Sequence, residues 1–213
     1  MDRRELLKMI AVLTGGAVIG GDFLLQGCKN PSAKTGLVFT DDDIAFLNEV
    51  AETILPATQT PGAKAAQVGR FMTVIVNDCY EEGDQKIFHE GIEKLDQACK
   101  EMHHARFMNV RPVDRHELLV ALDKEAKDYQ KKRNDFNKEQ NEKEKVEIAK
   151  GNKDFKKEKM PNHYFTMMKQ LTLWGYFTSK EGITNAFRYV PTPGRYEGII
   201  DYKKGDKMFA GLE

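Results

Sequence analysis

The side chains best suited to chemistry in this sequence are Cys99 and His103, which stand four residues apart in a predicted helix and share one face. A thiolate and an imidazole at this spacing can ligate a metal. They form a single ligand pair, with His104 adjoining, and the sequence offers no second cluster of ligands. We therefore predict no metal site, and keep a metal or redox subunit that uses Cys99 and His103 as an alternative.

Three neighbouring acids, Asp41 to Asp43, are the second candidate, this time for calcium. An EF-hand loop needs alternating acids, a central glycine and a distal glutamate, and these are absent around this stretch. Thr40 immediately before the acids is a typical helix N-cap, and carboxylates stabilise the positive end of the helix dipole. The pattern therefore predicts a helix start rather than an ion site.

Motifs that carry catalysis are missing from the sequence. No G-x-G-x-x-G opens a strand–helix unit, and no phosphate loop is present. Serine is scarce and the histidines cluster without a nucleophile, which argues against a Ser-His-Asp arrangement. No C-x-x-C-H attaches a c-type haem. We predict no catalytic, cofactor-binding or metal-binding residues, and a chain that is not an enzyme by itself.

Composition bounds the class of protein. The 213 residues suit one domain plus an export segment, and 33 basic against 33 acidic residues give a net charge of zero. Without a basic excess, nucleic acid is not predicted as a partner. Cys79 and Cys99 lie about four residues before and about sixteen after a turn near Gly83, too far apart to bridge two straight antiparallel helices. Both are predicted to be buried free thiols.

The first residues form a predicted targeting segment. The pair Arg3-Arg4 resembles a twin-arginine motif, and the apolar run that follows is too short to span a bilayer. Leu25 to Cys28 resembles a lipobox, which predicts lipidation of Cys28 after cleavage. We expect a signal over residues 1–27, a tether over 28–39, and a periplasmic, membrane-anchored protein. A buried N-terminal helix is the alternative for the segment, and a lone cysteine in a leader is the alternative for Cys28.

The mature chain is predicted to be all-α. Apolar spacing predicts a helix that ends before Pro56, a tight loop through Pro61-Gly62, and a second helix whose stripe ends at Cys79. Further apolar stripes predict three longer helices and a short one capped by Ser179. The residues of these stripes are Val68, Phe71, Met72, Ile75 and Cys79; Phe88, Ile92, Leu95, Cys99 and Met102; Leu118, Leu119 and Leu122; and Phe165, Met168, Leu171, Trp174 and Phe177.

These elements predict an irregular bundle of about five to six helices over residues 40–187, with Trp174 as a core anchor. Within it, residues 124–159 form a predicted charged helical extension, in which apolar residues thin out and 13 basic face nine acidic residues. A solvated helix extension is the favoured interpretation. An arm that lies on a partner or on lipid headgroups is the alternative.

Residues 188–213 are predicted to be an extended, proline-rich tail, because prolines and glycines prevent it from adding a helix. Tyrosine and arginine are enriched at interface hot spots, so the tail is the predicted partner surface and the proline loop a weaker candidate. The predicted interface residues are Tyr189, Pro191, Pro193, Gly194, Arg195 and Tyr196, together with Pro56 and Pro61.

Two separated stretches resemble one protein family, the gluconate 2-dehydrogenase subunit 3 family. The first runs from Glu52 to Tyr80 and contains E-T-I-L-P, T-P-G-A-K-A-A and a helix that ends D-C-Y. The second, Arg188 to Gly198, is R-Y-V-P-T-P-G-R-Y-E-G and is similar to the family pattern R-Y-x-P-x-P-G-R-Y/F-x-G.

The resemblance implies the small, non-catalytic subunit of a membrane-associated periplasmic dehydrogenase for sugars or polyols. It implies a glucose–methanol–choline-type flavoprotein partner that carries FAD, and a c-type cytochrome with haem that takes the electrons. A twin-arginine signal on this subunit would export the folded flavoprotein through the translocon. A free-standing periplasmic lipoprotein is the alternative, and gluconate, glucose and glycoside 3-hydroxyl oxidation stay open as the reaction.

Overall fold

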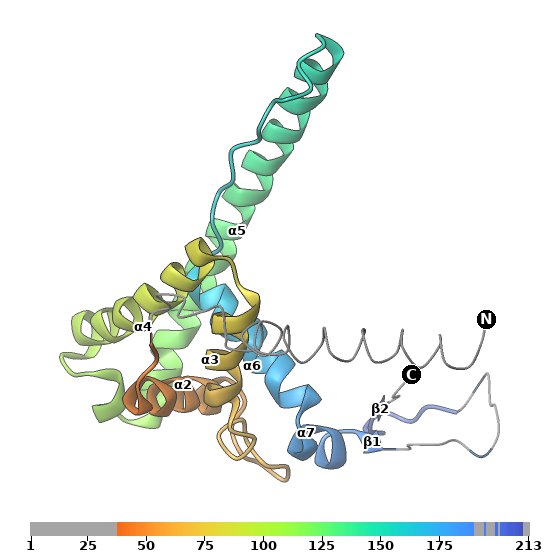
Figure 1. Cartoon of the computed structure of the whole chain (residues 1–213). Helices are drawn as coiled ribbons and strands as arrows, with labels where there is room; N and C mark the ends of the chain where they lie inside the picture. The colour runs from red at the N-terminus through yellow and green to blue at the C-terminus, as the bar shows by residue number, and fades with distance from the viewer. Residues whose placement is uncertain (1–37, 190–193, 195–198, 200, 211–213) are drawn as a thin grey trace, which may run out of the picture. The chain divides into compact units, whose positions relative to one another are not determined.

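The computed structural model describes residues 38–189, 194, 199 and 201–210 (Figure 1). This part of the chain is helical, with six α-helices, as the sequence predicted. They are α2 (Asp41–Ile54), α3 (Val68–Cys79), α4 (Glu82–His103), α5 (Pro112–Ala149), α6 (Tyr164–Thr178) and α7 (Lys180–Asn185). A 3₁₀ turn, η1 (Phe107–Asn109), and two short strands, β1 (Arg188–Tyr189) and β2 (Phe209–Ala210), complete the order.

Helix α2 begins where the sequence predicted. The Thr40 hydroxyl accepts from the Asp43 backbone N–H at 3.2 Å, and the Asp43 carboxylate accepts from the Thr40 backbone N–H at 2.9 Å. This reciprocal capping box, with acids in the first turn, explains the three aspartates without an ion. The helix ends at Ile54, two residues before Pro56. Its buried face packs on α3, α5 and α6.

Helices α2 and α3 approach closely at Gly69. A Cβ on this residue would lie 2.6 Å from the Ile44 carbonyl oxygen, so only glycine fits the crossing. The Gly69 N–H donates to Asn48 Oδ1 at 2.9 Å, which fixes the register between the two helices. The predicted stripe of α3 is correct at its start, but Cys79 is exposed rather than buried. It is the last residue of α3, where the helix ends.

Helix α6 differs from the prediction in which face is buried. Trp174 is 50% exposed, and it is not the core anchor that its spacing suggested. The predicted stripe advances by three residues, and each step turns an α-helix by about 300°, so the series drifts by about 60° per step. It therefore starts on the buried face at Phe165 and ends on the exposed face at Phe177. Gly175 and Tyr176 occupy the buried positions instead.

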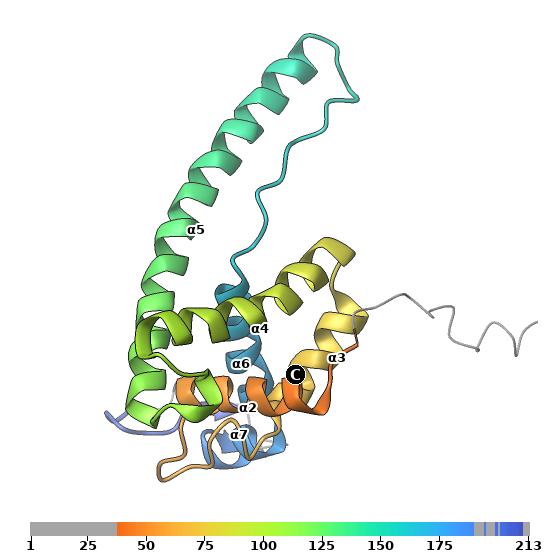
Figure 2. The ribbon, with the colours of Figure 1, turned by 90° about the vertical axis from the view of Figure 1, so that its left-hand side faces the viewer.

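The base of α5 packs on the bundle and the rest forms an arm, residues 127–163, that extends beyond it (Figure 2). Ala126 is the last apolar residue of α5 that is buried. The helix ends at Ala149, ten residues before the predicted limit of 159, and Gly151 at φ 90° begins the reversal. Glycine adopts this left-handed conformation without steric cost. Residues 150–163 then return along the helix as an irregular segment.

After α6, the described part of the chain forms only short helices and strands. The Ser179 hydroxyl accepts from the Gly182 N–H at 3.0 Å and caps α7, as predicted, although α7 ends at Asn185 rather than Phe187. Strands β1 and β2 pair in parallel over two residues each, with Arg188 opposite Phe209. The described part of the predicted tail therefore contains one small strand pair and otherwise no helix or strand.

One carboxylate ties three parts of the fold together. Glu49 on α2 pairs with Lys64 in the loop before α3 and with Arg115 Nη1 of α5 at 2.6 Å. Arg115 also donates to the carbonyl oxygens of Phe107 and Met108 at 3.0 and 2.9 Å. Burial acts to raise the pKa of Glu49, but Lys64 and Arg115 outweigh it and hold the pKa below 4.5. The ionised form is therefore favoured by folding.

We predict that Glu49→Gln lowers the free energy of unfolding by about 1–3 kcal/mol near neutral pH, because Arg115 is left without its charged acceptor. Since folding lowers this pKa, the contribution is present above the unfolded value near 4.5 and disappears as the pH falls through the lower folded value. Urea unfolding followed by circular dichroism at several pH values measures the difference in free energy of unfolding between the parent protein and the variant. The matched control is Glu93→Gln, an exposed glutamate of α4 without an ion pair to any described residue. If this difference in free energy of unfolding stays constant with pH, the ion pairs of Glu49 do not stabilise the fold.

Candidate partner interface

The loop between α2 and α3 is held by a carboxylate of the first family-like motif. Glu52 Oε1 accepts from the Ala57 N–H at 2.9 Å, and Oε2 accepts from the Lys64 N–H at 2.8 Å. Gly62 packs directly on this carboxylate, and a Cβ there would overlap both oxygens and lie 2.6 Å from the Ala57 nitrogen. Glu52 and Gly62 of this motif therefore serve to close the loop.

The same loop is bound to α6. The Tyr176 hydroxyl donates to the Pro61 carbonyl oxygen at 2.7 Å, and Tyr176 itself is 4% exposed. Pro61 is half-buried against its own domain, whereas Pro56 is exposed. Of the two loop prolines predicted to face a partner, only Pro56 is therefore exposed.

The predicted tail surface falls partly outside the described residues. Tyr189 is 44% exposed at the end of β1, and Gly194 is exposed. Arg188 lies over the Phe209 ring at 4.8 Å, and its N–H donates to the Met208 carbonyl oxygen at 2.8 Å. The predicted residues Pro191, Pro193, Arg195 and Tyr196 lie outside the part that the structure describes. The same holds for Arg3, Arg4 and Cys28 of the targeting segment.

An exposed apolar surface on α3 and α6 was missed by the sequence reasoning. Trp174 meets Phe71 edge-on at 5.2 Å between ring centroids, and Phe177 meets Phe187 at the same separation. Leu173 and Phe177 are each 38% exposed and Val74 is 50% exposed. We call this set, Phe71, Val74, Leu173, Trp174 and Phe177, the aromatic face. Counting positions along α6 by 100° rather than by threes would have placed it on the outside.

The Phe177–Phe187 contact joins the aromatic face to the tail, because Phe187 directly precedes β1. Helix α7 contacts both α6 and β1, and Figure 1 shows α6, α7 and the strand pair in succession. Tyr202 and Met208 of the tail are also strongly exposed, at 75% and 73%. The aromatic face and the tail thus follow one another on the molecule and present aromatic and sulfur-containing side chains to solvent.

The Cys99 thiol is poorly suited to binding a metal. Cys79 and Cys99 are both free, as predicted, and Cys99 is fully buried. Burial, helped by the nearby Asp96, raises the pKa of the Cys99 thiol, which disfavours the thiolate that a metal needs. Within the described residues, no three His, Cys, Asp or Glu side chains gather as metal ligands. Among those residues, no helix is both long and apolar enough to cross a bilayer.

The fold and its exposed aromatic face define a helical protein with a surface suited to a protein partner. A family model described as gluconate 2-dehydrogenase subunit 3 matches residues 41–194, more than half of the chain. The chain therefore belongs to the gluconate 2-dehydrogenase subunit 3 family, as the two motifs predicted, and the family is named for a subunit of an oxidoreductase complex. No curated protein and no solved structure matches it.

We predict that Gly62→Ala destabilises the protein by about 2–4 kcal/mol, because the added methyl displaces the Glu52 carboxylate from two backbone donors. Gly83→Ala is the matched control, since a Cβ there meets nothing within 4 Å and alanine favours the helix. Thermal unfolding of both variants measures the difference. Equal melting temperatures for the two would show that the loop tolerates the methyl and is not closed by Glu52.

Proposed function

We propose that this chain is the non-catalytic small subunit of a periplasmic flavin-dependent dehydrogenase for sugars or polyols. It docks on the catalytic glucose–methanol–choline-type flavoprotein, which carries FAD, and stabilises it. A c-type cytochrome with haem accepts the electrons. Membership of the subunit 3 family supports the oxidoreductase complex, and the aromatic face is the observation that supports docking.

The aromatic face has the composition of an interface core. Aromatic side chains are enriched at such cores, and tryptophan is among the commonest hot-spot residues. Trp174 keeps half of its surface in water although Phe71 supports its ring edge-on, so it is both exposed and held in one place. A preordered aromatic side chain loses little entropy when a partner covers it. The aromatic face and the adjoining tail are therefore the surface that we assign to the flavoprotein.

We also propose that this chain directs export of both subunits and attaches the complex to the membrane. A flavoprotein must fold around FAD in the cytoplasm, and the twin-arginine route moves folded cargo. The pair Arg3-Arg4 on the small subunit would thus serve both chains, as an escort does. Lipidation of Cys28 would then hold the complex at the membrane.

We predict that Trp174→Ala weakens binding of the flavoprotein subunit by at least about 30-fold, the effect of a hot-spot residue. The melting temperature of the isolated subunit should change little, because half of the ring is already in water. Co-purification of a tagged small subunit with the large subunit measures binding. Val120→Ala, which truncates a side chain of α5 that is 56% exposed, is the control.

The double variant Arg195→Ala/Tyr196→Ala tests the tail in the same assay. Loss of the large subunit at an unchanged melting temperature supports docking through the tail. A collapsed melting temperature in either variant means that the side chains pack their own domain. Unchanged co-purification in both variants would refute the assigned surface.

We predict that changing Arg3 and Arg4 together to lysine retains both subunits in the cytoplasm, because twin-arginine export depends on the arginine pair. Cell fractionation followed by dehydrogenase activity in the periplasmic fraction measures export of each chain. If the large subunit still reaches the periplasm while the small one does not, the escort role is refuted.

A further inference from the structure

The arm is a built structure rather than a loose helix end. The return segment, residues 150–163, is fastened to α5 along its length: Tyr129 Oη donates to the Pro161 carbonyl oxygen at 3.1 Å, and Arg133 Nε donates to that of Met160 at 2.9 Å. Gln140 is 4% exposed although it lies far out on the arm, and its side-chain oxygen accepts from the Glu158 N–H at 3.3 Å. These contacts hold the far end of the arm in a defined place.

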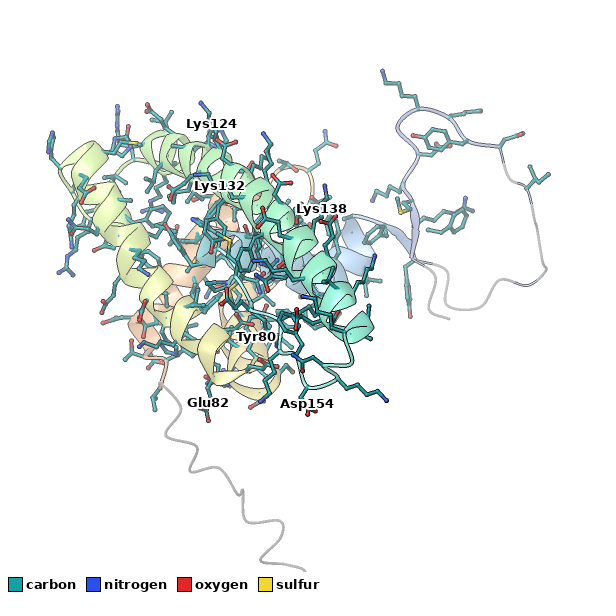
Figure 3. The ribbon with its side chains drawn as sticks, turned by 90° about the horizontal axis from the view of Figure 1, so that it is seen from above. Tyr80, Glu82, Lys124, Lys132, Lys138 and Asp154 are labelled. Atoms are coloured by element: carbon teal, nitrogen blue, oxygen red, sulfur yellow. The ribbon has the colours of Figure 1, made fainter. Side chains whose placement is uncertain are left out.

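The far end of the arm carries a net positive charge. We define the arm tip as residues 143–159, which contain seven lysines and four acids, whereas the whole chain has a net charge of zero. Nearer the bundle, Lys127, Lys131 and Lys138 each pair with an aspartate of the same helix. Figure 3 shows Lys124, Lys132 and Lys138 following α5 and Asp154 in the return segment. The lysines of the tip that pair with no described residue are Lys143, Lys145, Lys153, Lys156 and Lys159.

The tip also exposes two aliphatic side chains. Val146 and Ile148 are 52% and 53% exposed, and they are the large apolar residues of the arm that face solvent. Phe155 is the aromatic residue of the tip; it belongs to the return segment and is half-buried beside Val146 of α5. An exposed aliphatic side chain that shares a helix face with a lysine, as Ile148 does with Lys145, suits the boundary between lipid headgroups and acyl chains.

Protein interfaces have a different composition. Their cores are enriched in aromatic residues and arginine and depleted in lysine, whereas the arm tip contains no arginine and no exposed aromatic ring. The aromatic face on α6 has the opposite character, so the two surfaces suit different occupants. Clustered lysines next to a membrane are attracted by anionic headgroups, with a contribution from each lysine.

We infer that the arm tip binds an anionic lipid surface, with unpaired lysines on the headgroups and Ile148, which shares a helix face with Lys145, at the acyl boundary. This contact is separate from the proposed lipid at Cys28 and needs no partner subunit. A single acyl chain gives only marginal attachment, and a basic patch is the kind of second signal that makes it firm. Lipid binding by the arm tip does not depend on the dehydrogenase complex, so it can be measured with the purified chain alone.

The test uses the full chain with Cys28→Ser, so that no acyl group contributes. Co-sedimentation is measured with vesicles of equal parts phosphatidylglycerol and phosphatidylcholine, and with vesicles of phosphatidylcholine alone. We expect binding to the anionic vesicles that weakens with added salt, because screening shortens the reach of the charges. Changing Lys145, Lys153 and Lys156 to glutamine should reduce that binding by about ten- to one hundred-fold.

The matched control changes Lys127, Lys131 and Lys138 to glutamine, which removes the same charge from the part of the arm nearer the bundle. An equal loss in both variants would show attraction by net charge alone and would overturn the arm tip as the site. Equal binding to neutral and anionic vesicles would overturn it as well. If the tip variant binds vesicles like the parent but loses the flavoprotein in co-purification, the tip is a protein contact and the inference is wrong. Circular dichroism of each variant checks that α5 is intact.

Discussion

The ion pairs of Glu49 are the constraint on which the rest of the structure depends. This carboxylate is mostly shielded from water, and it links α2 to the loop before α3 through Lys64 and to α5 through Arg115. Arg115 in turn binds two carbonyl oxygens of η1 and lies over the Phe107 ring. A half-buried charge with good partners stabilises one arrangement of helices, because any other arrangement would leave it unpaired. The bundle that results sets the direction of α5 and therefore of the arm.

The loop from Leu55 to Gln67 shows how a family motif can serve structure first. Glu52 closes the loop on two backbone donors, Gly62 leaves room for that carboxylate, and Tyr176 fastens the loop to α6. These contacts also fix α6 beside α3, which is where Phe71 supports Trp174. The residues that carry the family resemblance thus hold the surface that we assign to the flavoprotein, rather than forming most of it themselves.

The chain separates two kinds of surface by distance along the fold. The aromatic face lies on the bundle next to the tail, and the lysine-rich tip lies at the end of α5 (Figures 1 and 2). Aromatic burial is largely insensitive to salt, whereas attraction between lysines and anionic headgroups is screened by it. With such an arrangement the proposed dehydrogenase partner would occupy one surface while the other stays free for the proposed lipid contact.

The sequence by itself determined the helical class, the family and the ends of several helices. Thr40 and Ser179 cap their helices as predicted, and α2 ends before Pro56, because these signals act on the backbone within a few residues. The direction in which a helix faces was not determined in this way. Trp174 and Cys79 are exposed, and Gln140 is buried, because neighbouring segments distant in sequence cover one side of each helix and not another. For Trp174, a count of 100° per residue would have shown that three-residue steps drift away from the buried face. For Cys79 and Gln140 only the tertiary structure decided the exposure, because the segments that cover a helix face or leave it open are distant in sequence.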